Sequence, residues 1–134
     1  MLTLLKIFDT TTASIGKKSE GIFTVYVSGE TITVRELIRL RIFQEVEKYN
    51  ETQPAVFRML VQPGEAEQTL NGFKFRQPRQ VDPQAQYEKA IQAYENNGFI
   101  VLVDDQQAGS LDDTIRLRPE TSVTFLKLLP LLGG

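Results

Sequence analysis

The stretch Thr31-Ile32-Thr33-Val34-Arg35-Glu36-Leu37 carries the sharpest local signal in the chain, because it contains a helix start. Thr33 followed three residues later by Glu36 is a capping box, in which the threonine hydroxyl accepts a hydrogen bond from a helix amide and the glutamate reaches back. The helix is predicted to run to about Tyr49-Asn50. One broad apolar face is expected along it, made by Val34, Leu37, Ile38, Ile42 and Val46.

Strand-like segments lie on both sides of this helix. Leu2–Asp9 and residues 22–27 precede it, with a turn at Ser28-Gly29-Glu30, where glycine tolerates the reversal. Three further strand segments follow nearer the C-terminus, at residues 99–103, 114–117 and 123–128, with a turn at Asp104-Asp105. The first two strands are expected to form a hairpin, and the later strands to join the same sheet.

This order of elements predicts an α+β domain with a mixed sheet and a helix packed on one face. We expect one domain over residues 1–134, with an insertion at about 51–98 and a flexible C-terminal tail at 129–134. Alternation along the strands assigns the core. Its expected members are Phe23, Val25, Val34, Leu37, Ile38, Val101, Val123 and Phe125.

The expected insertion contains a hairpin and a helix. Asn71-Gly72 between short strand-like runs is a hairpin signal, since both turn positions favour positive φ. Residues 56–61 are expected to form a further strand. A second helix is predicted over residues 82–97, with Asp82 as its N-cap and Pro83 in its first turn. Its apolar stripe, expected to pack on the rest of the domain, consists of Tyr87, Ala90, Ile91 and Tyr94.

Composition excludes several classes of function. The chain of 134 residues contains no cysteine and no histidine, so it offers no thiol nucleophile, no histidine base and none of the usual zinc ligand sets. A net charge of −2 gives no electrostatic reason to expect nucleic acid. The longest apolar runs are far too short to span a bilayer, and no signal peptide is recognisable. We therefore expect a cytoplasmic protein that is not an enzyme and holds no metal or cofactor.

Both ends of the chain carry a family resemblance. Three features carry it. They are the hairpin leading into residues 31–37, the strand with its turn at residues 99–104, and the closing Ser122–Leu126 followed by a proline and Gly133-Gly134. Together they resemble the ubiquitin-like β-grasp proteins, above all the small subunit of molybdopterin synthase and the thiamine sulfur carrier. The resemblance covers roughly two-thirds of the chain. The segment 51–98 departs from it.

The resemblance implies that the carboxylate of Gly134 is adenylated by an activating enzyme. The acyl group then passes to an acceptor protein as an isopeptide, or becomes a thiocarboxylate for a sulfur-accepting enzyme. A Gly133-Gly134 lead suits this step, since glycine has no Cβ to obstruct the backbone in an enzyme's active site. A protein modifier, a sulfur carrier and a β-grasp interaction module whose tail is never activated all remain open.

The leucines around the start of the tail are candidate contacts for a partner. If Val123 and Phe125 point inward, Thr124, Leu126 and Leu128 point outward, beside the tail that holds Leu131 and Leu132. These leucines are expected to dock the activating enzyme. The alternative is that the inserted segment covers them.

Weaker motifs favour structural roles. Gly16-Lys17-Lys18-Ser19 lacks the first glycine of a phosphate loop, because position 11 is threonine. The pairs Asp104-Asp105 and Asp112-Asp113 fit turns better than a metal site, since aspartate bonds nearby backbone amides. Residues 73–76 alternate aromatic and basic side chains as in single-strand binders, but a hairpin with one buried face explains them better.

Overall fold

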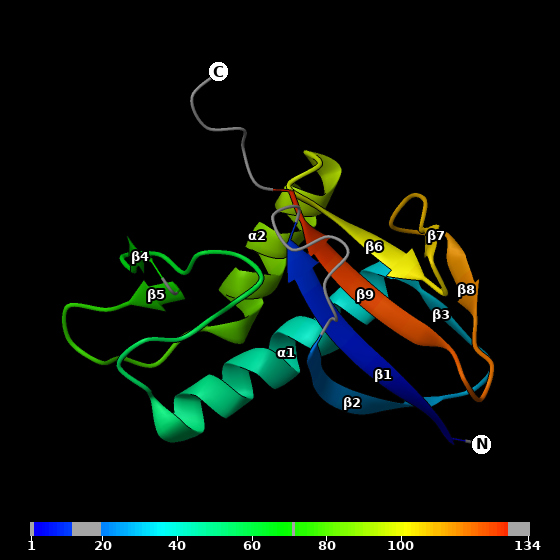
Figure 1. Ribbon diagram of the computed structural model, residues 1–134, viewed down its shortest axis with the longest axis horizontal. Helices are drawn as coiled ribbons and strands as arrows, with labels where there is room; N and C mark the ends of the chain where they lie inside the picture. The colour runs from blue at the N-terminus through cyan, green and yellow to red at the C-terminus, as the bar shows by residue number, and fades with distance from the viewer. Residues whose placement is uncertain (1, 12–19, 71, 129–134) are drawn as a thin grey trace. The chain divides into compact units, whose positions relative to one another are not determined.

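The computed structural model describes residues 2–11, 20–70 and 72–128, and of residues 20–23 it describes the backbone alone. The fold is α+β, as predicted. Within the described residues it comprises a five-stranded mixed sheet, two two-stranded sheets and two helices (Figure 1). Phe23, which was expected in the core, has a side chain outside the described set.

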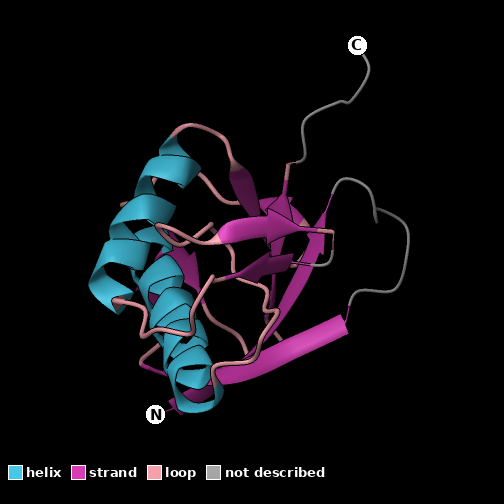
Figure 2. Ribbon diagram, turned by 90° about the vertical axis from the view of Figure 1, so that its left-hand side faces the viewer, coloured by secondary structure: helices cyan, strands magenta, loops and turns pink. Residues whose placement is uncertain are grey.

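The chain divides into two compact units, which are described separately. The first comprises residues 1–37 and 94–134, and the second residues 38–93. Both helices, drawn in cyan in Figure 2, continue from one unit into the other. The second unit contains most of the expected insertion.

The five-stranded sheet belongs to the first unit. Its strand order is β2-β1-β9-β6-β7, visible in Figure 1 as β1, β9 and β6 running side by side. The interior strands β1 and β9 are parallel, with Ile7 opposite Val123, and the other neighbours are antiparallel. The strands are β1 (Leu2–Thr11), β2 (Glu20–Ser28), β6 (Phe99–Val103), β7 (Gln106–Gln107) and β9 (Ser122–Lys127).

Alternation along these strands buries one face of the sheet. Every second residue of β1, β2, β6 and β9 points to the same side, so apolar residues two apart share one core. Val25, Val101, Val123 and Phe125 are buried, as predicted. The core residues contributed by these strands are Leu5, Ile7, Val25, Val27, Phe99, Val101, Val123 and Phe125.

The helix start is the one that the capping box predicted. Helix α1 (Val34–Thr52) follows β3 (Thr31–Thr33) directly, and the Glu36 amide donates to the Thr33 hydroxyl at 3.1 Å. The amides of Val34 and Arg35 donate to backbone carbonyls of the 111–113 loop, which leads into β8 (Thr114–Arg116). Strands β3 and β8 form an antiparallel pair, so this loop is held against the helix N-terminus. Val34 and Leu37 are fully buried.

The second unit has its own aromatic core. Tyr49 of α1 packs on Phe57, which stacks on Phe75 and faces Phe73. The predicted hairpin forms as β4 (Glu67–Thr69) and β5 (Gly72–Lys74). A side chain at position 72 would collide with the Phe57 carbonyl oxygen, so glycine is needed there.

The predicted strand at residues 56–61 is wrong. Only Phe57 makes a β-bridge, to Phe73, and the rest of the segment is irregular. After Phe57, two of its backbone groups are bonded to side chains. The Leu60 amide donates to the Glu45 carboxylate, and the Val61 carbonyl accepts from the Gln86 amide group.

Helix α2 (Pro83–Glu95) begins as predicted, because the Gln84 amide donates to the Asp82 carboxylate at 3.1 Å. It ends two residues earlier than expected. Ala90 of the predicted stripe is fully buried, whereas Tyr87, Ile91 and Tyr94 are half-buried. The other buried residue of α2 is Gln86, a polar position outside the stripe.

Candidate functional site

The base of the tail is the part of the predicted activation site that the structure describes. Gly133 and Gly134, with Leu131 and Leu132, lie outside the described residues. Strand β9 leads to them from between β1 and β6, so it is hydrogen-bonded on both sides. After it, the Leu128 amide donates to the Gly98 carbonyl at 3.2 Å. The chain is therefore held in place up to the last described residue.

The expectation that Leu126 and Leu128 both face outward is wrong for Leu126. It is only 8% exposed, whereas Leu128 is 37% exposed. Leu126 lies on an interior strand, opposite Thr10 of β1 and Ile100 of β6, and both of these residues are half-buried. Of the two leucines, Leu128 alone is accessible to a partner.

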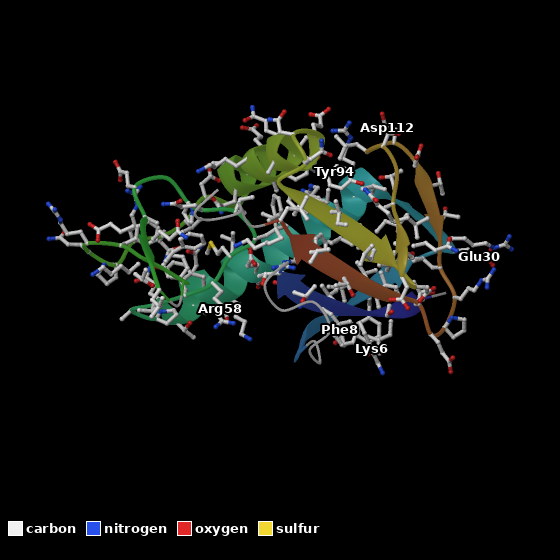
Figure 3. All side chains as sticks on the ribbon, turned by 45° about the horizontal axis from the view of Figure 1, so that its top comes forward. Lys6, Phe8, Glu30, Arg58, Tyr94 and Asp112 are labelled. Carbon is white, nitrogen blue, oxygen red and sulfur yellow. The ribbon has the colours of Figure 1, made fainter. Side chains whose placement is uncertain are left out.

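Apart from Leu128, the exposed large apolar side chains that the structure describes in the first unit lie on β1 and β2. Tyr26 is 67% exposed and stands directly opposite Leu4, which is also exposed. Leu2 lies two residues before Leu4, on the same face, and is exposed as well. Lys6 and Phe8 continue this row on β1, and Figure 3 shows both side chains on the same side of the strand. We call Leu2, Leu4 and Tyr26 the outer apolar patch.

Sequence reasoning missed this patch for a physical reason. Leu4 and Leu5 are adjacent and both apolar, so alternation alone does not decide which of them faces the core. Two signals discriminate: Lys6 lies between Leu5 and Ile7, and Tyr26 lies between Val25 and Val27. A charged side chain and a tyrosine both tolerate a wet face better than leucine or valine.

A cavity of about 490 Å³ opens in the first unit, where α2 ends and β6 begins. Phe99 and Leu111, both buried, and half-buried Ile100 give it an apolar floor. Arg35 lies at its edge, with its Nε 3.4 Å from the carboxylate of Asp112.

Tyr94 supplies an aromatic wall to this cavity. Its ring packs on Phe99 with 5.5 Å between the ring centroids, and its hydroxyl donates to the carbonyl oxygens of Ala108 and Gly109. Burial raises the pKa of the Tyr94 hydroxyl, and the nearby Asp113 carboxylate raises it further. The hydroxyl is therefore a protonated donor that ties α2 to the 108–109 segment. Figure 3 labels Tyr94 and Asp112, both of which line the cavity.

The two acidic pairs have structural partners. Asp104 and Asp105 both have positive φ in the two-residue turn between β6 and β7, and the Asp104 carboxylate accepts from the Ser122 amide. Asp113 accepts from the amide and hydroxyl of Ser110. Among the residues that the structure describes, no three acidic, histidine or cysteine side chains are grouped to hold a metal ion.

The remaining motifs have simple outcomes. Gly16-Lys17-Lys18-Ser19 lies outside the described residues. In the aromatic and basic run, Phe73 is buried and Lys74 is 3.9 Å from the Glu67 carboxylate, as expected for a hairpin with one buried face. Neither described helix is long and apolar enough to cross a membrane.

No protein-family model, no curated protein and no solved structure matches the chain.

Proposed function

We propose that this chain is a ubiquitin-like β-grasp protein whose C-terminal glycine carboxylate is activated by a separate adenylating enzyme. In this proposal the chain is a substrate and carrier, not a catalyst. A hairpin before α1 shares one mixed sheet with strands from the other end of the chain, which is the arrangement that the family resemblance implies. This arrangement supports the β-grasp assignment.

The observation that carries the proposal is the anchoring of the tail base. Strand β9 is bonded to β1 and β6, and the Leu128–Gly98 hydrogen bond also holds the residue that follows the strand. Gly134 is the sixth residue after Leu128. Six residues span at most about 22 Å, so the reacting carboxylate stays within that distance of the anchored strand.

The reaction uses no side chain of this protein. An oxygen of the Gly134 carboxylate forms a bond to the α-phosphorus of ATP, and pyrophosphate leaves. The acyl-adenylate is then attacked by a lysine amine of an acceptor protein or by a sulfur donor, and AMP leaves. Which nucleophile collects the glycine distinguishes a protein modifier from a sulfur carrier.

The outer apolar patch is the second part of the proposed site. Exposed aromatic and aliphatic side chains grouped on one face mark protein contacts, and Tyr26, Leu4 and Leu2 are such a group. We assign this patch, together with Leu128, to docking of the activating enzyme. It replaces Leu126, which is buried.

The test is ATP–pyrophosphate exchange with the activating enzyme of the same organism. Gly134→Val and deletion of Gly133-Gly134 should each abolish exchange, because the reacting group is displaced or removed. Gly64→Val is the control, since a side chain at this glycine meets open space. If the truncated chain is activated as well as the intact one, the proposal fails. An interaction module that binds through the outer apolar patch would then take its place.

A further inference from the structure

The two edges of the five-stranded sheet differ in length. At one edge β7 comprises two residues, whereas at the other edge β2 comprises nine residues and, among the described strands, is paired with β1 alone (Figure 1). Natural edge strands of this length are commonly blocked by lysine, proline or a bulge, because a row of unpaired backbone groups accepts another strand. Strand β2 contains neither lysine nor proline, and its one charged residue, Glu20, stands at its start.

The hydrogen bonds of β9 show which way the backbone groups of each strand point. In an antiparallel pair, alternate residues bond to the neighbouring strand, and the residues between them point their N–H and C=O groups the other way. The Leu128 amide donates to the Gly98 carbonyl, so even-numbered residues of β9 point toward β6. Odd-numbered residues of β9, such as Val123, therefore point toward β1.

The same alternation continues through β1 to the edge strand. Val123 lies opposite Ile7 in the parallel pair, so it bonds to the two neighbours of Ile7, and Ile7 and Leu5 point their backbone groups toward β2. Val25, opposite Leu5, then points back toward β1. Tyr26, the next residue, points its N–H and C=O toward the open edge. Within the part of the chain that the structure describes, no hydrogen bond occupies these two groups.

A second copy of this chain fits the edge, because β2 is complementary to itself. Two antiparallel β2 strands related by a two-fold axis at Tyr26 place each Tyr26 opposite its counterpart, so that each N–H donates to the other C=O. Thr24 then stands opposite Ser28 of the second copy. Glu20 lies beyond the end of the other β2, so no like charges meet along the pair.

The outer apolar patch also favours a second copy. Leu4 stands opposite Tyr26 within one chain, and both side chains are exposed on the same face. In the two-fold pair, the two tyrosines become cross-strand neighbours, so Leu4, Tyr26, Tyr26 and Leu4 form one continuous row. Cross-strand aromatic and aliphatic contacts of this kind stabilise strand pairing.

We propose that two copies of this chain associate edge to edge through β2, with Tyr26 on the two-fold axis and five strands from each copy in one continuous sheet. The inference goes beyond the proposed function and does not depend on activation of Gly134. The side chains of the outer apolar patch project from the face of the sheet and not from its edge. Both patches therefore lie side by side on one face of the pair and stay open to an activating enzyme.

Analytical ultracentrifugation of the full-length chain tests the association. The mass should rise from that of one chain toward that of two as the concentration is raised from about 10 µM to about 1 mM. A chain that stays monomeric over this range overturns the inference, and the edge would then be left for an extended segment of another protein.

Charges at the Thr24–Ser28 pair test the register. Thr24→Glu combined with Ser28→Glu places carboxylates opposite each other on both sides of the axis, and should raise the dissociation constant about tenfold. Thr24→Glu combined with Ser28→Lys is the matched control, because opposite charges then meet and association should persist. Both positions are exposed, and Lys6 lies opposite Thr24 on β1, so circular dichroism should show both variants folded. Equal dissociation constants for the two variants overturn the inference.

Hydrogen exchange shows which surface the two copies use. The Tyr26 amide should exchange fast in dilute solution and more slowly as the concentration rises, because the second copy then accepts its hydrogen bond. The Val25 amide, which faces β1, should be protected at every concentration and is the internal control. Copies that associate by stacking their outer apolar patches would leave exchange at Tyr26 unchanged, and that result also overturns the inference.

Discussion

At the scale of single residues, Tyr94 links several parts of the first unit. Its ring lies on Phe99, and its hydroxyl donates to the carbonyls of Ala108 and Gly109. Removing the hydroxyl in Tyr94→Phe should lower the free energy of unfolding at pH 7 by about 1 kcal/mol, the usual value of one hydrogen bond. Urea denaturation measures this, with Tyr87→Phe on the same helix as control.

The same substitution should change the alkaline limb of the stability profile. Burial and Asp113 raise the pKa of Tyr94 above 10, its value in an unfolded chain. The unfolded state therefore ionises first, so this contribution to stability is fully present below about pH 10 and is lost as pH rises through the folded pKa. Tyr94→Phe should decline less steeply there than the wild type. Parallel profiles above pH 10 would contradict the assigned cause.

Leu126 gives a second prediction at this scale. It is buried on an interior strand, so Leu126→Asp places a carboxylate where water is excluded. We expect a loss of stability at least as large as the 2–5 kcal/mol of a buried leucine-to-alanine change. Leu128→Asp, at the exposed neighbour two residues on, is the matched control and should leave the melting temperature nearly unchanged. Equal melting temperatures for the two variants would show that Leu126 is accessible.

At the scale of elements, a feature was predictable from the sequence when its hydrogen-bond partners lie close together along the chain. The start of α1 was predictable, because the Thr33 hydroxyl and the Glu36 amide are three residues apart. The turn at Asp104-Asp105 was predictable for the same reason, since its geometry is set by two consecutive residues. All the residues that fix such a cap or turn lie within a few positions of one another in the sequence.

The segment 56–61 was not predictable in this way. Its composition favours a strand, yet Leu60 is bonded to Glu45, 15 residues away, and Val61 to Gln86, 25 residues away. Tertiary context decided the conformation, as it often does for short apolar runs. The cavity was hidden for the same reason, because Arg35 and Asp112 are 77 residues apart.

Glu45 is one of the residues that hold this irregular segment in place. Its carboxylate is 2.8 Å from a nitrogen of Arg41, which is buried, and also accepts from the Leu60 amide. Glu45→Ala should cost about 3–5 kcal/mol, the usual cost of breaking a buried ion pair, and should speed hydrogen exchange at Leu60. Glu45→Gln keeps an acceptor for that amide, so exchange at Leu60 should stay slower than in Glu45→Ala. Unchanged exchange in both variants would show that Glu45 does not order the segment.

At the scale of the whole molecule, the proposed function needs a folded body and a reactive end that are chemically independent. The body comprises two compact units, while the proposed chemistry uses only Gly134. The activating enzyme must therefore recognise a surface of the body, and the outer apolar patch is the surface that we assign to it. This assignment can be tested without altering the tail.

Tyr26→Thr is the sharpest test of that assignment. Threonine favours strands as tyrosine does, so the variant should unfold within about 1 kcal/mol of the wild type. Tyr26 is the large aromatic residue of the patch, and aromatic anchors often contribute more than 1 kcal/mol to a protein interface. We expect KM for the chain in the adenylation reaction to rise about tenfold. The rate at saturating concentrations of the chain should be unchanged, because Gly134 still reaches the nucleotide. Arg116→Gln, at an exposed residue of β8, is the control and should behave as wild type.

A reduced rate at saturating concentrations of the chain, with normal KM, would instead place Tyr26 in the chemical step. Normal values of both would move the docking surface away from β1 and β2.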